Sequence, residues 1–294
     1  MMNGLYWAGL AAALVIYLLL FFLGVHRQHL PVRFFALACI LSAMSAFCLS
    51  RGNVFLFGGF MTRMRGFLSL LPYDHSMMGT LLGIVLGTAV AAFITKVPVR
   101  LGLDVITPAS LAAVVIARFA EGASDFGWGA LVFEPQLQFF PLCIADMYNQ
   151  FHLAVFLFEG LAALCIFCLM PRTSSGSGCR FWISACRFML AQIFLESLRA
   201  ETLRIGFVRV QQVECAVLLL LMALLIPRNS RKMMIQSVAA VLIMVGVSVF
   251  AEFALDKITI IPAPAVYLLL CSALTGCGVV LCCMIRHVCT GRSH

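Results

Sequence analysis

The chain has 294 residues, of which 63% are hydrophobic and 11% are charged, and its mean hydropathy is +1.06. A soluble domain is about 45–50% apolar, so this composition excludes an ordinary soluble globular protein. The formal net charge of +8 would point to nucleic acid only if lipid failed to explain it. Basic loops that face anionic lipid explain it well. The composition therefore predicts a multi-pass membrane protein with no nucleic-acid partner.

Nine apolar segments are long enough to be predicted as membrane-spanning helices, because a helix needs roughly 20 apolar residues to cross a bilayer. They cover residues 4–24, 32–50, 77–95, 101–118, 151–170, 180–198, 206–226, 233–252 and 264–285. The first is not predicted to be a cleaved signal peptide, since no basic residue precedes it and its apolar run is too long. The predicted fold class is an all-α polytopic membrane protein with about nine transmembrane helices.

The charges of the connecting segments predict how these helices are oriented. Basic residues gather in alternate loops and in the tail, where no acidic residue occurs: Arg27, Arg33, Lys96, Arg100, Arg172, Arg180, Arg228, Arg231, Lys232, Arg286 and Arg292. Nine acidic residues lie in the other loops or at the helix ends that face them: Asp74, Glu121, Asp125, Glu134, Asp146, Glu201 and Asp256 in the first place, and Glu196 and Glu252 in the second. Because cytoplasmic loops carry the excess of Lys and Arg, the N-terminus is predicted outside and the C-terminus in the cytoplasm.

The 13 cysteines do not predict a metal site. Most of them lie in the apolar segments, where a cysteine acts as a small hydrophobic residue. The Cys165-x-x-Cys168 pair has no histidine and no second pair nearby, which zinc or redox chemistry would need. We expect no metal and no cofactor.

The stretch 188–212 concentrates charge between two apolar segments and is predicted to face outward. It contains Glu196, Arg199, Glu201, Arg204 and Arg209. On a helix, Gln192, Glu196 and Arg199 share one face, because they are spaced four and three residues apart. Two interpretations stay open: a rim of surface ion pairs whose side chains reach water, or a polar site, since charge near lipid must pair or face a wet cavity.

Other polar side chains lie at the same predicted level of the membrane. His75 precedes the third span and is either an interfacial residue or a general base near neutral pH. Arg118 and Glu121 are three residues apart at the outer end of the fourth span, either as a local ion pair or as part of a site. Glu214 lies inside the seventh span, behind Gln212 and Arg209, and a carboxylate there indicates function or pairing.

Together these residues predict a cationic, outward-facing pocket at the level of the lipid headgroups, because arginine binds phosphate as a planar fork. Arg118 is expected at a helix end and not in a packed core, so Arg118→Ala is expected to leave the protein folded. Glu159, in the middle of the fifth span, is isolated in the sequence and is predicted to make a structural hydrogen bond.

Three segments carry a resemblance to a known family. Asp74-His75-Ser76-Met77-Met78-Gly79 is similar to a His-Gly-Gly that opens a membrane helix, without the glycine pair. Residues 117–129 resemble a Gly-Arg-x-Gly-Asn-Phe-x-Asn-Gly-Glu-x-Tyr-Gly element. Arg118 and Gly129 match it, Trp128 replaces its aromatic residue, Glu121 and Ser124 stand at its Asn positions, and Phe126 stands at its acidic position. Residues 188–199 with Gln212 resemble Tyr-x3-Arg-x3-Glu-x2-Arg and a later Gln, with Phe188 for the Tyr and Gln192 for the first Arg.

These are the motifs of the prolipoprotein diacylglyceryl transferases, and the chain resembles a divergent member of that family over residues 1–228. The two spans in 229–294 exceed the family's usual seven. The resemblance implies an enzyme of the bacterial plasma membrane that takes a diacylglyceryl group from phosphatidylglycerol. The acceptor would be the lipobox cysteine of a prolipoprotein signal peptide.

The resemblance also implies roles for individual residues. His75, Arg118, Glu196 and Arg199 would be catalytic, with His75 as base, the two arginines on the phosphate and Glu196 orienting Arg199. The substrate-binding residues would be Glu121, Gln192, Arg204, Arg209, Gln212 and Glu214, in one cavity with the catalytic four. A homologue that binds phospholipid headgroups without transfer is the first alternative, because Gln192 lacks the charge of an arginine. A secondary transporter is the second, suggested by Glu159 and Glu214.

Overall fold

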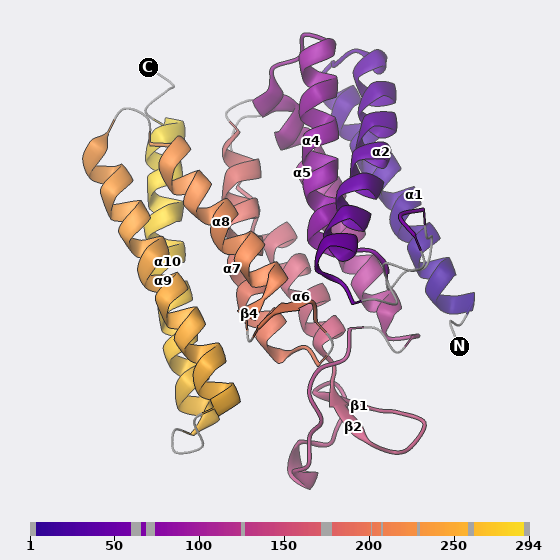
Figure 1. The fold of residues 1–294 in the computed structure, drawn as a ribbon. Coiled ribbons are helices and arrows are strands. Elements are labelled where there is room, and N and C mark those ends of the chain that lie inside the picture. Colours follow the sequence, from indigo (N-terminus) through magenta and orange to yellow (C-terminus); the bar gives the residue numbers. More distant parts are fainter. Residues whose placement is uncertain are drawn as a thin grey trace. The chain divides into compact units, whose positions relative to one another are not determined.

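The computed structural model describes residues 4–59, 66–68, 74–124, 127–171, 178–200, 202–206, 208–227, 230–257 and 262–290. Several residues discussed above lie outside this set: Asp125, Phe126, Arg172, Glu201, Arg228 and Arg292. The described residues form nine α-helices, which confirms the all-α prediction (Figure 1). The helices are α1 (Gly4–Arg27), α2 (Val32–Phe57), α4 (Met77–Ile94), α5 (Val99–Glu121), α6 (Val155–Cys168), α7 (Cys179–Leu198), α8 (Val210–Leu225), α9 (Arg231–Lys257) and α10 (Ala263–Thr290).

Seven of these helices are long and apolar enough to cross a membrane, so the chain is a multi-pass membrane protein. The other two, α6 and α8, have 14 and 16 residues. At a rise of 1.5 Å per residue they are about 21 and 24 Å long, which is less than the roughly 30 Å hydrocarbon core. The spans predicted at 151–170 and 206–226 are therefore too long, because residues 151–153 and 208–209 form β-strand and not helix.

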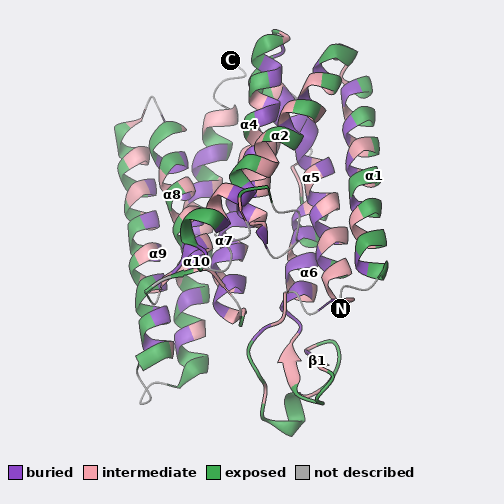
Figure 2. Ribbon diagram, turned by 45° about the vertical axis from the view of Figure 1, so that its right-hand side comes forward, coloured by how far each residue is buried: buried purple, intermediate pink, exposed green. Residues whose placement is uncertain are grey.

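These strands belong to two short antiparallel hairpins. β1 (Cys143–Ala145) pairs with β2 (Phe151–Leu153), and β3 (Arg204–Ile205) pairs with β4 (Val208–Arg209). Residues 129–132 add backbone hydrogen bonds to the other edge of β2. A single 3₁₀ turn, η2 (Pro135–Leu137), lies in the long connection before β1. The first hairpin extends beyond the neighbouring ends of α5 and α6, and much of its surface is exposed (Figure 2).

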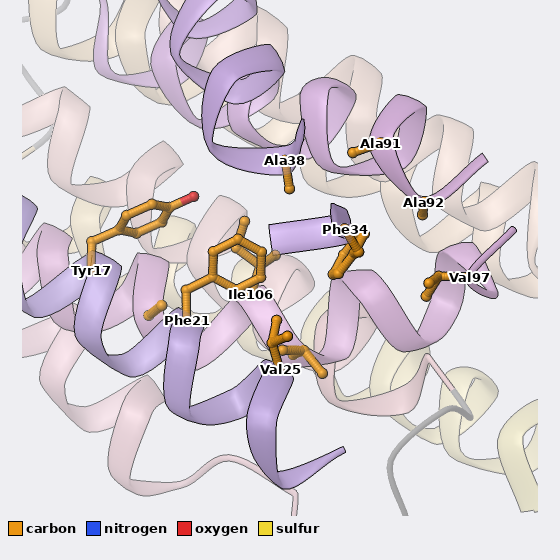
Figure 3. Packing of buried hydrophobic residues seen from close by; sticks show 11 residues of the cluster. Tyr17, Phe21, Val25, Phe34, Ala38, Ala91, Ala92, Val97 and Ile106 are labelled. Carbon is orange, nitrogen blue, oxygen red and sulfur yellow. The ribbon is translucent and has the colours of Figure 1, made fainter. Parts of the chain in front are cut away.

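The chain forms two compact units, Met1–Phe181 and Trp182–His294. In the first unit α1 packs along α5, α2 along α4, and α6 along α5. Its apolar core contains the fully buried rings of Phe21 and Phe34, which meet edge to face at 5.9 Å (Figure 3). In the second unit α9 packs against both α8 and α10. The predicted boundary at residue 228, which rests on the family resemblance, stays a prediction.

A row of glycines brings α4 unusually close to α2. A Cβ atom on Gly79, Gly83 or Gly87 would lie 2.3–2.6 Å from backbone atoms of α2. The three glycines are four residues apart, so they share one face of α4. Small residues in this spacing let membrane helices approach until their backbones touch. The contact also fixes where α4 begins, and with it the position of His75 directly before the helix.

Many large apolar residues are exposed, and exposed residues recur along the helices of each unit in Figure 2. Phe93 in α4 is 81% exposed and Leu268 in α10 is 75% exposed. In water such surfaces would favour aggregation, whereas lipid tails are as apolar as the side chains themselves. The exposed apolar faces therefore fit helices that are surrounded by lipid.

Candidate functional site

A fully buried arginine that the sequence analysis did not single out holds the segment before α4. Arg51, near the C-terminal end of α2, forms an ion pair with the Asp74 carboxylate at 3.5 Å, and both side chains are fully buried. Its guanidinium also donates to the carbonyl oxygens of Asp74 at 3.0 Å and Phe67 at 3.1 Å, and to that of Gly66. Arg51 thus gathers two parts of the loop between α2 and α4 around one charge.

This arrangement places His75 against α2. The backbone N–H of Ser76 donates to the Ser50 carbonyl at 3.2 Å, and the Ser50 hydroxyl lies 3.3 Å from Nδ1 of His75. The Ser76 side chain accepts from the N–H of Gly79 and so begins α4 with a serine N-cap. If Nδ1 carries the proton and donates it to Ser50, then Nε2 is the nitrogen with a lone pair for base chemistry.

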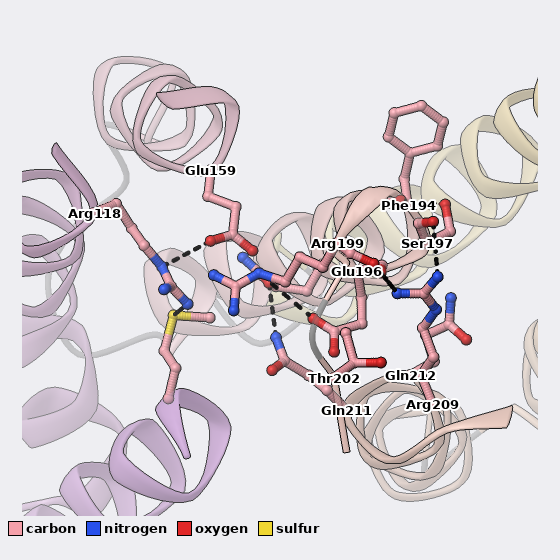
Figure 4. Close-up of polar contacts among 12 residues, drawn as sticks. Arg118, Glu159, Phe194, Glu196, Ser197, Arg199, Thr202, Arg209, Gln211 and Gln212 are labelled. Carbon is pink, nitrogen blue, oxygen red and sulfur yellow. Dashed lines mark hydrogen bonds and ion pairs between the residues drawn. The ribbon is translucent and has the colours of Figure 1, made fainter. Parts of the chain in front are cut away.

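Arg118 lies in the last turn of α5, where it is 4% exposed and held by carboxylates from two helices. Its Nε is 2.9 Å from an oxygen of Glu159 in α6, and its Nη1 donates to Glu121 one turn further along α5. Nη2 contacts the sulfur of Met77, at the start of α4 (Figure 4). The predicted pair of Arg118 with Glu121 is confirmed. Glu159, which the sequence leaves isolated, is its second partner.

Burial changes the expectation for Arg118→Ala. Arg118 lies at a helix end, as expected, but it is packed against Glu159, which is fully buried. Removing one member of a buried ion pair leaves the other charge uncompensated and costs about 3–5 kcal/mol. The premise that Arg118 lies outside a packed core is therefore wrong, and Arg118→Ala is expected to destabilise the protein.

Gly127 gives the Glu121 carboxylate its room. It adopts a left-handed backbone conformation with φ of 73°, which glycine accepts and most residues resist. A Cβ atom at this position would lie 2.3 Å from the Oε2 atom of Glu121. Gly127 therefore satisfies two requirements at once, a turn after α5 and close approach to a charged side chain.

In the second unit, Gln192, Glu196 and Arg199 follow one another along the face predicted from their spacing. Gln192 is 1% exposed and Glu196 is 3% exposed, so this face is buried. Arg199, just beyond the end of α7, keeps 15% of its side chain exposed and lies 3.9 Å from a Glu196 oxygen. The buried positions rule out a purely solvated rim for Gln192 and Glu196.

Arg209, in β4, closes the C-terminal end of α7. One Nη donates to the carbonyl oxygens of Glu196 and, at 2.7 Å, Arg199, and the other donates to that of Ser197 at 3.0 Å (Figure 4). Its Nε donates to Glu252 in α9 at 3.2 Å. The last carbonyls of a helix have no partner within the helix and carry its negative dipole end, so a cation there stabilises it. The three contacts with these carbonyls make Arg209 a helix cap.

Gln212 and Glu252 complete this cap. The Nε2 group of Gln212 donates to Glu252 at 2.7 Å and to the Ile193 carbonyl at 3.1 Å, and all three residues are buried. Glu252 therefore binds both Arg209 and Gln212. Helix α9 thus contributes a buried carboxylate to this cluster.

Two predicted substrate-binding residues have other surroundings. Arg204 is exposed in the second hairpin, where its Nε donates to the hydroxyl of Thr202 at 3.3 Å. Glu214 is half-buried in the second turn of α8. In the first unit the structure pairs Arg118 with Glu121, and His75 lies two residues before Met77, which touches Arg118. In the second unit it brings Glu196, Arg199, Arg209 and Gln212 together at the end of α7, with Gln192 one turn before Glu196. These are the two groups of predicted residues. That the two groups line one cavity stays a prediction.

The balance of charge within each group differs from the predicted cationic pocket. In the first unit one guanidinium, Arg118, faces two carboxylates. In the second unit Glu196 lies beside Arg199, Glu252 lies beside Arg209, and Glu214 is half-buried on α8. The predicted excess of positive charge is absent from these described residues. Binding of an anionic ligand would thus depend more on how individual hydrogen-bond donors are directed than on the net charge of the group.

Among the described residues, no three His, Cys, Asp or Glu side chains gather as a metal ion would require. Cys165 and Cys168 both lie on the exposed surface of α6.

The sequence matches no protein-family model, and it matches no curated protein.

Proposed function

We propose that the protein transfers a diacylglyceryl group from phosphatidylglycerol to the thiol of a lipobox cysteine, at the outer face of a bacterial plasma membrane. The observation that carries the proposal is the geometry of Arg118. Its guanidinium is buried at the end of a membrane helix and is held by carboxylates from α5 and α6. A donor fixed in this way need not reorganise when charge develops nearby, which is the basis of electrostatic catalysis.

In the proposed reaction His75 takes the proton from the cysteine thiol, because the thiolate is the nucleophile. The thiolate sulfur attacks C3 of the diacylglyceryl group and forms a thioether. The bond from C3 to the phosphate oxygen breaks, and glycerol phosphate leaves with that electron pair. Arg118 and Arg199 stabilise the charge that grows on the phosphate, and Glu196 orients Arg199.

The donor contacts of Arg209 favour a change to its predicted role. Since its guanidinium binds the end of α7 and Glu252, we assign it to positioning Glu196 and Arg199, not to holding the headgroup. Gln212 acts in the same way through Glu252. Arg204, which is exposed, remains available for the headgroup.

A second candidate is a homologue that binds phospholipid headgroups without transferring the lipid. Two observations favour it: Gln192 is neutral where the family has an arginine, and in both groups the guanidiniums are paired with at least as many carboxylates. The pairing of Glu159 with Arg118 weakens the transporter alternative, because this mid-span carboxylate has a structural partner.

The test uses purified protein in lipid nanodiscs with phosphatidylglycerol that is labelled in its diacylglyceryl part. A lipobox peptide is added, and the matched control peptide has serine in place of the lipobox cysteine. Thioether formation on the cysteine peptide alone is the expected result, measured by mass spectrometry. Headgroup-selective lipid binding without product supports the second candidate. If the protein neither binds the lipid selectively nor forms product, both candidates are overturned.

A further inference from the structure

Gln192 is a buried amide whose oxygen accepts a hydrogen bond and whose NH₂ group donates none within the described residues. Its Oε1 atom accepts from the Nε2 group of Gln211, in α8, at 2.8 Å. Its own Nε2 group is buried and has no hydrogen-bond partner among the described residues. An unpaired donor in this position costs about 1–3 kcal/mol, so a protein retains one only for a reason.

The neighbouring Gln212 shows what a structural glutamine looks like in the same cluster. It is also buried, at 6% exposed, but its Nε2 group donates to both Glu252 and the Ile193 carbonyl. The contact with Gln211 fixes the Oε1 side of Gln192 and therefore leaves its NH₂ side directed elsewhere. The two glutamines thus differ in role: Gln212 joins α8 to α7 and α9 by hydrogen bonds, whereas the NH₂ group of Gln192 is a donor that a ligand could use.

The depth of Gln192 indicates what this donor meets. Gln192 precedes Arg199 by seven residues on one face of α7, so it lies about 10 Å from Arg199 along the helix axis. The interfacial layer on each side of a bilayer is about 5–8 Å thick. With Arg199 at the level of lipid phosphate, Gln192 is near the boundary with the hydrocarbon, where the acyl ester groups of phospholipids lie.

The charge of the cluster favours a neutral ligand atom at this point. Glu196 lies one turn from Gln192, and Glu214 lies one turn from Gln211 on α8. A phosphate close to these carboxylates would be repelled, whereas a carbonyl oxygen accepts a hydrogen bond without bringing charge. We propose that the Nε2 group of Gln192 donates to the ester carbonyl oxygen of a bound glycerophospholipid and so selects diacyl over diether lipids. This inference rests on the lipid site of the proposed function but not on its transfer step.

The experiment pairs a change in the protein with a change in the lipid. Binding of diacyl and diether phosphatidylglycerol with matched chains is measured by native mass spectrometry for the wild type and Gln192→Met. The wild type should prefer the diacyl lipid by about 5–10-fold, the value of one neutral hydrogen bond. Gln192→Met should bind both lipids equally. A wild type without preference, or a variant that keeps the preference, overturns the proposal.

Thermal unfolding without added lipid supplies the control. Gln192→Met removes an unpaired buried donor but also the oxygen that accepts from Gln211, so it should lose less thermal stability than Gln212→Met, which removes two hydrogen bonds. A loss in Gln192→Met as large as that in Gln212→Met would mean that its NH₂ group braces the protein, and would overturn the inference. Ester preference without thioether product refutes the proposed transfer and keeps this inference. Product formation without ester preference supports the proposed transfer and refutes this inference.

Discussion

Two buried arginines, Arg118 and Arg209, solve the same problem with different partners. Arg118 is neutralised by side chains, the carboxylates of Glu121 and Glu159. Arg209 is satisfied mainly by backbone, through three carbonyls at the end of α7, with Glu252 as its one carboxylate. The first arrangement fixes a charge in a chosen direction. The second uses a charge to end a helix, so the first suits chemistry and the second suits support.

Helix α7 is also capped by a charged side chain at its N-terminal end. Asp104, a buried carboxylate in α5, accepts from the backbone N–H groups of Gly178 and Phe181, each at 2.9 Å. A negative charge there complements the positive end of the helix dipole, as Arg209 complements the negative end. Charged side chains from other elements therefore cap α7 at both ends.

The largest effect is expected at Arg118. Arg118→Met should lower the free energy of unfolding by about 3–5 kcal/mol, because it leaves Glu159 buried without its cation. Adding Glu159→Gln should recover part of the loss, because the uncompensated charge is then gone. Unfolding is followed by tryptophan fluorescence in detergent with increasing denaturant. An Arg118→Met protein as stable as the wild type would contradict the buried pair.

Arg209→Met sharpens the comparison because a second substitution should not rescue it. We expect a loss of about 2–3 kcal/mol, since the variant removes the guanidinium donor from three carbonyls and the paired cation from Glu252. Adding Glu252→Gln to this variant removes the unpaired carboxylate charge, but the three carbonyls at the end of α7 still lack the donors that Arg209 supplied. The same unfolding experiment measures both variants. Rescue as large as that of Arg118→Met by Glu159→Gln would show that the ion pair, not the cap, is the main role of Arg209.

Asp104 should matter less, because its partners are backbone N–H groups near the start of a helix, where other acceptors compete. Asp104→Ala should cost about 1 kcal/mol, the usual value for loss of an N-cap side chain. Asp104→Asn retains an acceptor oxygen and should cost less, which makes it the matched control. Hydrogen exchange of the first turn of α7 should rise in Asp104→Ala. Unchanged exchange would argue against the cap.

The smallest effect is a pH dependence confined to the first hairpin. Partial loss of hydration raises the pKa of the Asp146 carboxyl. The backbone N–H groups of Gln150 and Tyr148, each at 2.8 Å, and His152 lower it by more, so the net pKa lies below its usual range. A depressed carboxyl pKa stabilises the folded hairpin above the unfolded value, and this contribution is lost as the pH falls through the folded pKa.

The hairpin should therefore loosen below about pH 3.9, and Asp146→Asn should remove this dependence. The Trp128 ring packs at a tilt against the His152 ring, with centroids 5.1 Å apart, and reports the change through its fluorescence. The measurement uses a variant with Trp7→Phe and Trp182→Phe, so that one tryptophan remains. The same transition in Asp146→Asn would assign the pH dependence to another group.

The sequence by itself determined where the long helices lie, because in lipid a helix must satisfy its own backbone groups and only a long apolar run can do so. It also contained the four-residue spacing of Gly79, Gly83 and Gly87, from which the contact of α4 with another helix was predictable. The two short helices were overextended, because apolar residues in strands β2 and β4 continue the same hydropathy signal.

The partners of the buried charges were decided only by the tertiary structure. Arg51 and Asp74, Arg118 and Glu159, and Arg209 and Glu252 each come from different elements. No local pattern links such residues, since spacing predicts only neighbours on one helix face. A buried charge must nevertheless find a partner, so the sequence shows that each of these residues needs one. Which one it finds depends on helix packing, and that depends on the shape of side chains throughout the interface.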